Sequence, residues 1–250
     1  MVVFNVDMDN TLIYSYKHDI GEDKYCAEIY QEREISFMTH KTGRLLKELA
    51  GKILIVPTTT RTREQYERIN LGIGKIPYAL VCNGGVLIRD GIEDEDWYAT
   101  SRQMIEDCKE ELELGRKLLE EDEDRCFEVR FIKELFLFSK SDQPERTIKR
   151  LSEKLNLALV NVFSNGTKVY VVPVKLNKGT ALQRFKEWIQ ADTTIAAGDS
   201  EFDVPMLACA DIGLAPQTLE MNKKISGELI KIPEKVLFSE GIVEYLYKRV

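Results

Sequence analysis

The chain has 250 residues, which is enough for one or two domains with a substantial apolar core, so folding does not need disulfides or a structural metal. Its 42 acidic and 35 basic side chains give a net charge of −7, and no basic cluster stands out, which argues against nucleic acids and membranes as partners. The five cysteines lack C-x-x-C spacing, and the sequence shows neither a signal peptide nor a membrane-spanning run, so we expect reduced thiols in a cytoplasmic protein.

The first ninety residues alternate strand and helix patterns. Short, continuous apolar runs at residues 2–6 and 53–56 are typical of parallel strands that are buried on both faces. Leu45, Leu46 and Leu49, which lie between these runs, have helical spacing. This alternation predicts an α/β core. The further elements expected here are a helix over residues 62–71, a strand over residues 78–83 and a short return strand over residues 86–88.

The pattern changes between residues 90 and 173. The elements expected here are a helix over 97–121, strands over 127–132 and 135–138, a helix that starts at Pro144 with Asp142 as its candidate N-cap, and strands over 157–163 and 167–172. Asn165-Gly166, between the last two strands, is a strong hairpin signal. The order α-β-β-α-β-β predicts an antiparallel sheet with two helices. We expect it to form a second domain, residues 90–173, inserted into a first domain of residues 1–89 and 174–250.

The alternation of helix and strand returns after the insertion. Helices are expected over residues 178–190, 204–210 and 242–247, and strands over residues 194–197 and 212–215. The fold class is therefore predicted to be α/β, with a Rossmann-like parallel sheet as the core and an inserted α+β domain.

Polar residues follow the predicted parallel strands, at the edge of the sheet where ligands bind in such folds. These residues are Asp7 and Asp9 after the first strand, Thr58, Thr59 and Arg61 after the second, and Asp199, Ser200 and Asp203 after the strand at 194–197. Four carboxylates brought together would repel one another and raise each other's pKa, unless a divalent cation lay between them. Ligands that are all oxygen atoms favour Mg²⁺.

A magnesium ion beside carboxylates and a lysine suits a phosphoryl group, whose negative charge must be neutralised before a nucleophile can approach. Because the chain has only two histidines, carboxylates are expected to carry the chemistry. One carboxylate would attack phosphorus and form an aspartyl phosphate, and a second would protonate the leaving oxygen and then activate water. Asp7 and Asp9 lie two residues apart, so their side chains point to the same side if the strand geometry continues.

Four ordered motifs resemble those of the haloacid dehalogenase (HAD) superfamily phosphatases. They are D-M-D-N-T at residues 7–11, T-T-R at 59–61, K-G-T-A-L at 178–182 and G-D-S-E-F-D at 198–203. The position of the insertion, after the third strand and before the motif lysine, resembles the C2-type cap of the Cof-like and sucrose-phosphatase-like branch. Its order of elements is similar to that of the C2B form.

The resemblance implies a role for each motif residue. Asp7 would be the nucleophile and a Mg²⁺ ligand, and Asp9 the acid/base that also offers its backbone carbonyl to the metal. Thr59 would hold the phosphoryl group, and Lys178 would neutralise the nucleophile and the phosphate. The remaining implied positions are Asp199 and Asp203 at the metal, directly or through water, and Arg61, Asn83, Thr60 and Ser200 at the substrate.

Some positions depart from the family pattern. Asn10 and Thr60 stand where glycine is usual, but asparagine tolerates the left-handed backbone better than most residues and is expected to keep the turn. Because three threonines follow one another at residues 58–60, the position of the phosphate contact is left open by one residue. Phe202 stands where Cof-like members often carry an asparagine that faces the metal. This replacement argues against direct coordination of the metal by this loop, but not against the metal itself. Residues 14–36 form a longer segment than in Cof-like relatives and are expected to be an extra flap.

Simpler structural roles compete with some of these assignments. Arg61 could form a structural ion pair instead of contacting substrate. Asp203 could cap the helix that starts near Val204, and this role can coexist with a role at the metal. Lys178 could be an ordinary charged residue in the first turn of a helix.

The sequence as a whole predicts a Mg²⁺-dependent phosphatase that hydrolyses a small phosphorylated metabolite, with a sugar phosphate as the favoured class. A phosphomutase or phosphotransferase that uses the same intermediate is the alternative among enzymes. A regulatory protein that binds Mg²⁺ without turnover is the alternative outside enzymes. The oligomeric state is left open.

Overall fold

The structure is a computed structural model that describes residues 1–249. The chain divides into two compact units, a first unit of Met1–Asp94 with the residues from Lys178 onward, and an inserted unit of Glu95–Asn177. The ends of the inserted unit lie within five residues of the boundaries 90 and 173 expected from the sequence. That this unit works as a cap domain stays a prediction.

A five-stranded parallel sheet forms the centre of the first unit, as the sequence predicts. Its order is β15 (Glu228–Ile232), β14 (Ile212–Pro216), β13 (Thr193–Ala197), β1 (Val2–Val6) and β5 (Leu54–Pro57). Val6 of β1 is in register with Ala197 on one side and with Pro57 on the other. The carboxyl ends of these three strands therefore lie side by side. The sequence analysis missed β15, an edge strand whose mixed pattern of polar and apolar residues is only partly buried.

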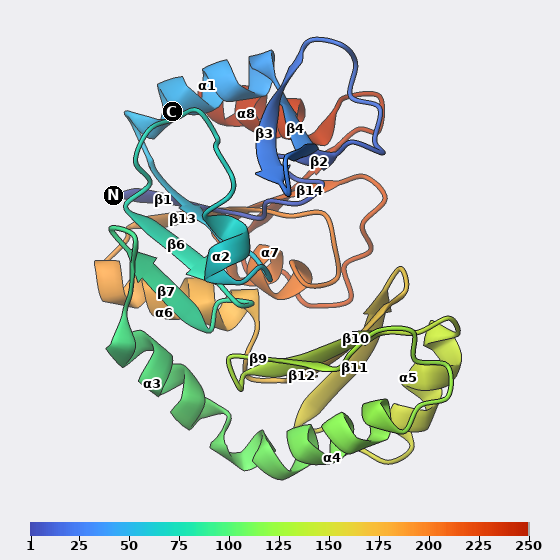
Figure 1. Ribbon diagram of the computed structural model, residues 1–250. Helices are drawn as coiled ribbons and strands as arrows, with labels where there is room; N and C mark the ends of the chain where they lie inside the picture. The colour runs from blue at the N-terminus through green and yellow to red at the C-terminus, as the bar shows by residue number, and fades with distance from the viewer. Residues whose placement is uncertain (250) are drawn as a thin grey trace. The chain divides into compact units, whose positions relative to one another are not determined.

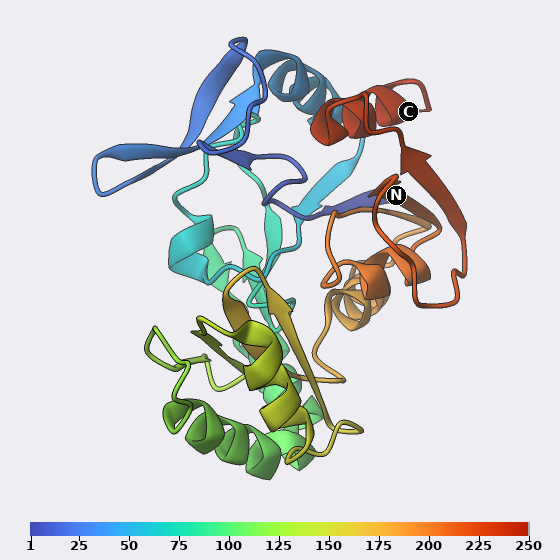
Figure 2. The ribbon, with the colours of Figure 1, turned by 90° about the vertical axis from the view of Figure 1, so that its right-hand side faces the viewer.

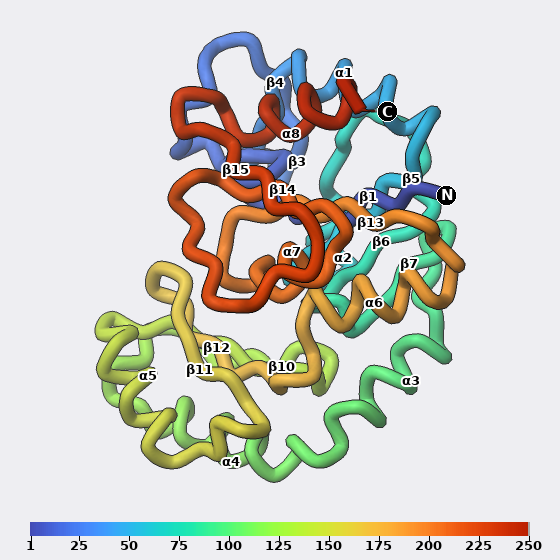
Figure 3. The backbone as a smooth tube through the Cα atoms, turned by 180° about the vertical axis from the view of Figure 1, so that it is seen from behind, coloured from blue at the N-terminus to red at the C-terminus, as the bar shows by residue number. Residues whose placement is uncertain are grey.

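Helices cover both faces of this sheet (Figure 1). On one face, α1 (His40–Ala50) and α8 (Phe238–Tyr247) lie side by side, as the view from behind also shows (Figure 3). On the other face lie α6 (Lys178–Ile189) and α7 (Val204–Cys209). Side chains that alternate along a strand belong to different apolar clusters, because Ala197 packs in the cluster of α1 and α8 and Ala196 in that of α6 and α7. The sheet is thus buried on both faces.

The third strand expected from the sequence, β6 (Tyr78–Val81), is present but lies outside the five-stranded ladder. It pairs with β7 (Val86–Arg89), and β7 pairs with β8 (Ile92–Glu93), in a small antiparallel sheet. A single parallel bridge joins Leu80 of β6 to Thr58, directly after β5. This bridge brings the end of β6 to the same edge as the ends of β1 and β5.

The segment expected to be an extra flap forms an antiparallel sheet of β2 (Tyr14–Ser15), β4 (Arg33–Thr39) and β3 (Lys24–Tyr30) (Figure 2). Gln31 and Glu32, with φ of 49° and 62°, form the two-residue turn of the β3–β4 hairpin. The register shifts on both sides of Glu28, which marks a bulge in β3. β4 leads directly into α1, and the hydroxyl of Thr39 caps this helix by accepting from the Thr42 amide at 3.1 Å.

The helix predicted over residues 62–71 is much shorter in the structure. α2 spans only Arg63–Tyr66, with a capping box between Thr62 and Gln65. The chain leaves the helix because it pairs with β3: Ile69 forms an antiparallel bridge with Glu28, and the Asn70 amide donates to the Ala27 carbonyl. A tertiary contact therefore outweighs the local helical pattern.

The inserted unit has the predicted order of helices and strands, with one correction. Its elements are α3 (Glu95–Met104), a 3₁₀ turn (Glu106–Cys108), α4 (Lys109–Glu120), β9 (Arg130–Ile132), β10 (Phe136–Lys140), α5 (Pro144–Ser152), β11 (Val160–Asn165) and β12 (Lys168–Pro173). The strands form an antiparallel sheet in the order β11-β12-β10-β9. The single helix expected over residues 97–121 is wrong, because the helix breaks at Ile105 and the break allows both Ile105 and Cys108 to be buried.

Two local assignments in the inserted unit also need correction. The N-cap position of α5 is Gln143 instead of Asp142, and no side chain caps this helix. The loop of the β11–β12 hairpin is Gly166-Thr167, because Asn165 still pairs with Lys168. Gly166 has a φ of 59°, the left-handed conformation that this turn needs.

None of the helices within residues 1–249 combines the length and the apolar character that crossing a membrane requires.

We expect Gly179→Ala to lower the urea concentration at which the protein unfolds. A Cβ atom at position 179 would lie 2.4 Å from the Pro205 carbonyl oxygen, so α6 and α7 would have to separate. Overpacking of this kind costs about 1–3 kcal/mol. Gly51→Ala is the control, because its Cβ atom would meet nothing closer than 3.8 Å. Equal unfolding midpoints for Gly179→Ala and the unmodified protein would contradict the close approach of the two helices.

Candidate active site

The loops that follow β1, β5 and β13 carry most of the candidate residues. The Asp7 amide donates to the Ala197 carbonyl at 2.9 Å, and the Thr58 amide donates to the Val6 carbonyl at 2.8 Å. These bonds continue the parallel ladders by one residue and bring Asp7, Thr58 and Gly198 to one edge of the sheet. The sequence prediction that these strand ends meet is therefore confirmed for the described residues.

A tight turn follows Asp7. The amides of Leu12 and Ile13 both donate to the Met8 carbonyl at 3.0 Å, and the Asn10 amide donates to the Ile13 carbonyl at 2.8 Å. Asn10 has a φ of 58°, in the left-handed region. This confirms the expectation that asparagine preserves the turn in place of the usual glycine.

Lys178, the first residue of α6, is buried between two carboxylates. Its Nζ atom lies 2.5 Å from Asp7 Oδ1 and 2.6 Å from Asp203 Oδ1, and its side chain is 1% exposed. Burial by itself lowers the pKa of Lys178, but the charges of Asp203 and Asp7 outweigh this effect and raise the pKa overall. Lys178 is therefore a buried ammonium group and not a charged residue on a helix surface.

Asp203 organises the loop after β13. It occupies the N-cap position of α7, but its side chain does not cap that helix. Its Oδ2 atom instead accepts from the amides of Asp199 and Ser200, at 3.2 and 3.1 Å, and from the Ser200 hydroxyl at 2.8 Å. A Cβ atom at Gly198 would lie 2.3 Å from Asp203 Cγ, so this packing needs glycine. The capping role considered for Asp203 is therefore wrong, and its role at the metal stays a prediction.

Three carboxylates, from Asp7, Asp199 and Asp203, each have a possible ligand atom within 4.8 Å of the others. Burial, followed by the charge of Asp203, raises the pKa of Asp199 to about 6. Burial also raises the pKa of Asp7, more than Lys178 lowers it, and the neighbouring carboxylates add to the rise. Both groups would be more stable as carboxylates with a cation beside them.

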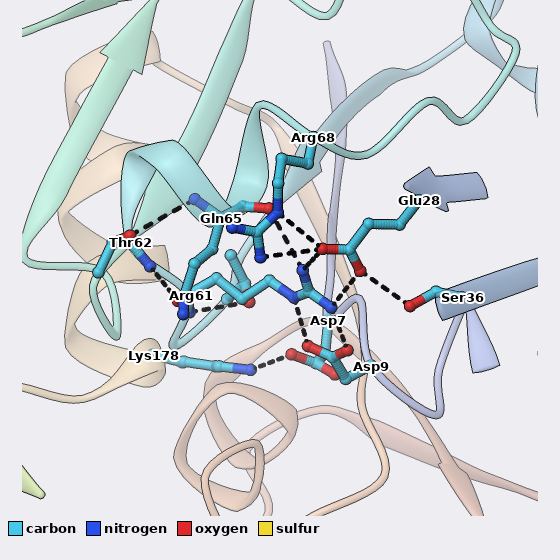
Figure 4. A network of polar contacts seen from close by, with 10 residues as sticks. Asp7, Asp9, Glu28, Ser36, Arg61, Thr62, Gln65, Arg68 and Lys178 are labelled. Carbon is cyan, nitrogen blue, oxygen red and sulfur yellow. Dashed lines mark hydrogen bonds and ion pairs between the residues drawn. The ribbon is translucent and has the colours of Figure 1, made fainter. Parts of the chain in front are cut away.

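Asp9 does not join this group of three carboxylates, although the sequence suggested that four would converge. Its two oxygens accept from Nε and Nη2 of Arg61, both at 2.7 Å (Figure 4). Arg61 also donates from Nη1 and Nη2 to Glu28, at 2.8 and 2.9 Å, and from Nη1 to the Gln65 carbonyl at 3.2 Å. A guanidinium group has five N–H donors, and these five bonds use all of them. The ion-pair alternative for Arg61 is therefore the one seen in the structure.

Glu28 is a site residue that the sequence analysis missed. Its side chain is 0% exposed and accepts hydrogen bonds from Arg61, from Arg68 Nε at 3.1 Å and from the Ser36 hydroxyl at 2.8 Å. Burial tends to raise the pKa of Glu28, but the hydrogen bonds and charge of Arg61, with Ser36 and Arg68, lower it overall. No periodic pattern in the sequence marks this residue, because a bulge in β3 turns Glu28 inward while the next two residues, Ile29 and Tyr30, are exposed.

The three threonines after β5 have different surroundings. The Thr58 hydroxyl donates to the Val56 carbonyl and accepts from Asn5, at 3.1 and 3.0 Å. The buried Thr59 hydroxyl accepts from the Arg61 amide at 3.2 Å, and the Thr59 amide donates to the Leu80 carbonyl. Thr60 is partly buried.

Asn83 and Ser200, two residues expected at the substrate, lie in loops at the same edge of the sheet. The Asn83 amide donates to the Thr59 carbonyl at 2.9 Å, and Asn83 is buried with a φ of 58°. The Ser200 hydroxyl donates a hydrogen bond to Asp203 Oδ2 at 2.8 Å. Substrate contact by Asn83, Ser200, Thr60 or Arg61 stays a prediction.

The Asp199 side chain is held by Thr11, which belongs to the turn after β1. The Thr11 hydroxyl donates to Asp199 Oδ1 at 3.1 Å, and Thr11 is fully buried. Thr11 belongs to the first motif but had no assigned role in the sequence analysis. Its contact links the loop after β1 to the loop after β13.

Comparison with known proteins identifies the family. The family model described as haloacid dehalogenase-like hydrolase matches residues 91–218, about half of the chain. A phosphoglycolate phosphatase from Methanopyrus kandleri is 25% identical over 214 residues, which are 83% of this chain and 88% of that protein.

Solved structures share the fold over nearly the whole chain. The sucrose-phosphatase of Synechocystis sp. PCC6803, solved with sucrose and phosphate, has a TM-score of 0.67 and 16% identity, covering 99% of this chain and 97% of that one. The HAD-superfamily phosphatase BT1666 from Bacteroides thetaiotaomicron has a TM-score of 0.57 and 16% identity, covering 100% and 96%. The match to the family model shows that the chain belongs to the haloacid dehalogenase-like hydrolase family, which confirms the family resemblance drawn from the sequence.

Proposed function

We propose that this protein is a Mg²⁺-dependent phosphatase that hydrolyses a small phosphorylated metabolite, with sugar phosphates as the favoured class. The observation that carries the proposal is the set of buried charges at the strand ends, where Asp7 contacts Lys178 and lies close to the carboxylates of Asp199 and Asp203. The similarity to a phosphoglycolate phosphatase supports the reaction, and the fold shared with a sucrose-phosphatase supports the substrate class.

Asp7 is the proposed nucleophile. One of its oxygens forms a bond to phosphorus, and the bond from phosphorus to the substrate oxygen breaks, with the electron pair going to that oxygen. Asp9, protonated when the substrate binds, gives this proton to the leaving oxygen and becomes a carboxylate, which later accepts a proton from the water that attacks the aspartyl phosphate. Phosphate leaves and Asp7 is regenerated. Lys178, which lies 2.5 Å from Asp7, offsets the negative charge that builds up around the phosphoryl group.

Thr59 is the threonine that we propose holds the transferring phosphoryl group. The Thr58 hydroxyl already donates to a backbone carbonyl, so its proton is engaged. The Thr59 hydroxyl acts as an acceptor, from the Arg61 amide, and its own proton can be donated to a phosphoryl oxygen. This difference favours Thr59 over its neighbour.

The residues present fit a magnesium ion. One oxygen of Asp7 accepts a hydrogen bond from Lys178, and one oxygen of Asp199 accepts a hydrogen bond from Thr11. The second oxygen of each carboxylate can serve as a ligand to the metal. Both oxygens of Asp203 accept hydrogen bonds, so we propose that Asp203 holds the loop and contributes through its charge. When bound, Mg²⁺ would offset the negative charge of the phosphoryl group and keep Asp7 and Asp199 ionised.

We expect Asp7→Asn and Asp9→Asn each to lower kcat for phosphate esters by about 10²-fold or more, because each removes a group that acts on the reacting atoms. The measurement is phosphate release from a panel of phosphorylated metabolites at fixed Mg²⁺. Asp19→Asn, which removes the charge of an exposed aspartate, is the control and should match the unmodified protein. Rates in Asp7→Asn that equal those of the unmodified protein would contradict a covalent intermediate.

The same assay separates the two alternative functions. A phosphotransferase would move the phosphoryl group to an added sugar and release little phosphate. A regulatory protein would bind Mg²⁺ and hydrolyse none of the esters.

Stability without metal should depend on pH in a defined direction. The pKa of Asp199 is raised from 3.8 to about 6, so between these values the native state keeps a proton that the unfolded state has released. In EDTA, the contribution of Asp199 to the free energy of unfolding should therefore fall as the pH rises from about 4 to about 6. Asp199→Asn should reduce this fall, and Mg²⁺ should oppose it by favouring the ionised form. Urea unfolding at several pH values measures the effect, and a profile unchanged by Mg²⁺ and by Asp199→Asn would contradict the metal site.

A further inference from the structure

The two carboxylates of the first motif have different surroundings. Asp7 is buried beside Lys178, whereas the side chain of Asp9 is 49% exposed. An exposed carboxylate rotates freely unless another group holds it. The planar guanidinium of Arg61 holds both Asp9 oxygens at 2.7 Å, in a bidentate geometry that fixes the orientation of the carboxylate.

Arg61 is in turn held by Glu28. Two of its five donors bond to Asp9 and two bond to the buried Glu28 carboxylate (Figure 4). Without Glu28, these two donors would be buried without an acceptor, or the guanidinium would turn toward solvent or phosphate to find one. The Arg61 side chain is only 14% exposed, so it has little access to water in its present position.

Glu28 reaches Arg61 because of local features of the hairpin. The bulge in β3 places the Glu28 side chain inward, while the next two residues, Ile29 and Tyr30, are exposed. Ser36 on β4 and Arg68 after α2 hold the same carboxylate from two other directions. The bridge between Glu28 and Ile69 ties the backbone of this segment to β3.

We propose that Glu28 is a positioning residue, which anchors Arg61 so that Arg61 holds Asp9 in the orientation for proton transfer. The inference rests on the proposed function, in which Asp9 is the acid and base. It makes the β3–β4 hairpin part of the active-site structure. Arg61 is accordingly a positioning residue as well, because all of its donors are bonded to the protein.

Two substrates with different leaving groups test this role. Glycerol 3-phosphate releases an alkoxide that needs a proton, whereas p-nitrophenyl phosphate releases a phenolate that leaves without one. The ratio kcat/KM reports the steps up to the first irreversible bond cleavage, in which Asp9 acts as the acid. Glu28→Gln should lower kcat/KM for glycerol 3-phosphate by about tenfold or more and that for p-nitrophenyl phosphate by less than about twofold.

The control variants lie at the same residue and on the same hairpin. Glu28→Asp keeps the negative charge and should recover part of the activity on glycerol 3-phosphate. Glu34→Gln makes the same substitution at an exposed residue of β4 and should behave like the unmodified protein on both substrates. An equal loss on both substrates would point to a general structural role and contradict the proposal, as would no loss on either.

A second measurement does not depend on turnover. The Nε–H of Arg61 donates to Asp9, so its ¹⁵N–¹H NMR signal, assigned with Arg61→Lys, should be protected from exchange with water. We expect Glu28→Gln to abolish this protection and Glu34→Gln to keep it. If the unmodified protein hydrolyses neither these two substrates nor any ester of the metabolite panel, the proposed function fails, but this signal still decides whether Glu28 anchors Arg61. An unchanged signal in Glu28→Gln would overturn the proposal.

Discussion

The rest of the site depends on one interaction, the buried ion pairing of the Lys178 ammonium group with the carboxylates of Asp7 and Asp203. Removing charged groups from water is costly, and the cost is offset only when each charge has a close partner. The fold meets this condition through close packing, because Gly179 lets α6 approach α7 and Gly198 leaves room for the Asp203 side chain. The three charged groups are therefore stable only as a set.

Two neighbouring charge networks separate the expected tasks of Asp7 and Asp9. Around Lys178, three carboxylates share one ammonium group, and the remaining negative charge suits a divalent cation. Around Arg61, the carboxyl groups of Asp9 and Glu28 form ion pairs with two guanidinium groups, those of Arg61 and Arg68. Two aspartates separated by one residue thus lie in different environments, which is how a single fold can give similar carboxyl groups different roles in catalysis.

The sequence predicted the core of the site because that core depends on local patterns. Apolar runs marked β1, β5 and β13, and the polar residues directly after them could be read without knowledge of the fold. The motif residues Asp7 and Lys178 proved to be in contact although 171 positions separate them. The parallel register of the strands accounts for much of this, since it brings their carboxyl ends to one edge.

Other features were decided only by tertiary contacts. The helix predicted over residues 62–71 ends at Tyr66, because Ile69 pairs with β3. Glu28 is buried beside Arg61 because of a bulge, which shifts the strand register and which no periodic pattern marks in advance. By itself, the sequence determined which residues end the buried strands and the family to which they belong. The tertiary structure decided which partner each charge has, because the partners of Asp9 and Arg61 come from elements whose approach depends on the packing of the whole unit.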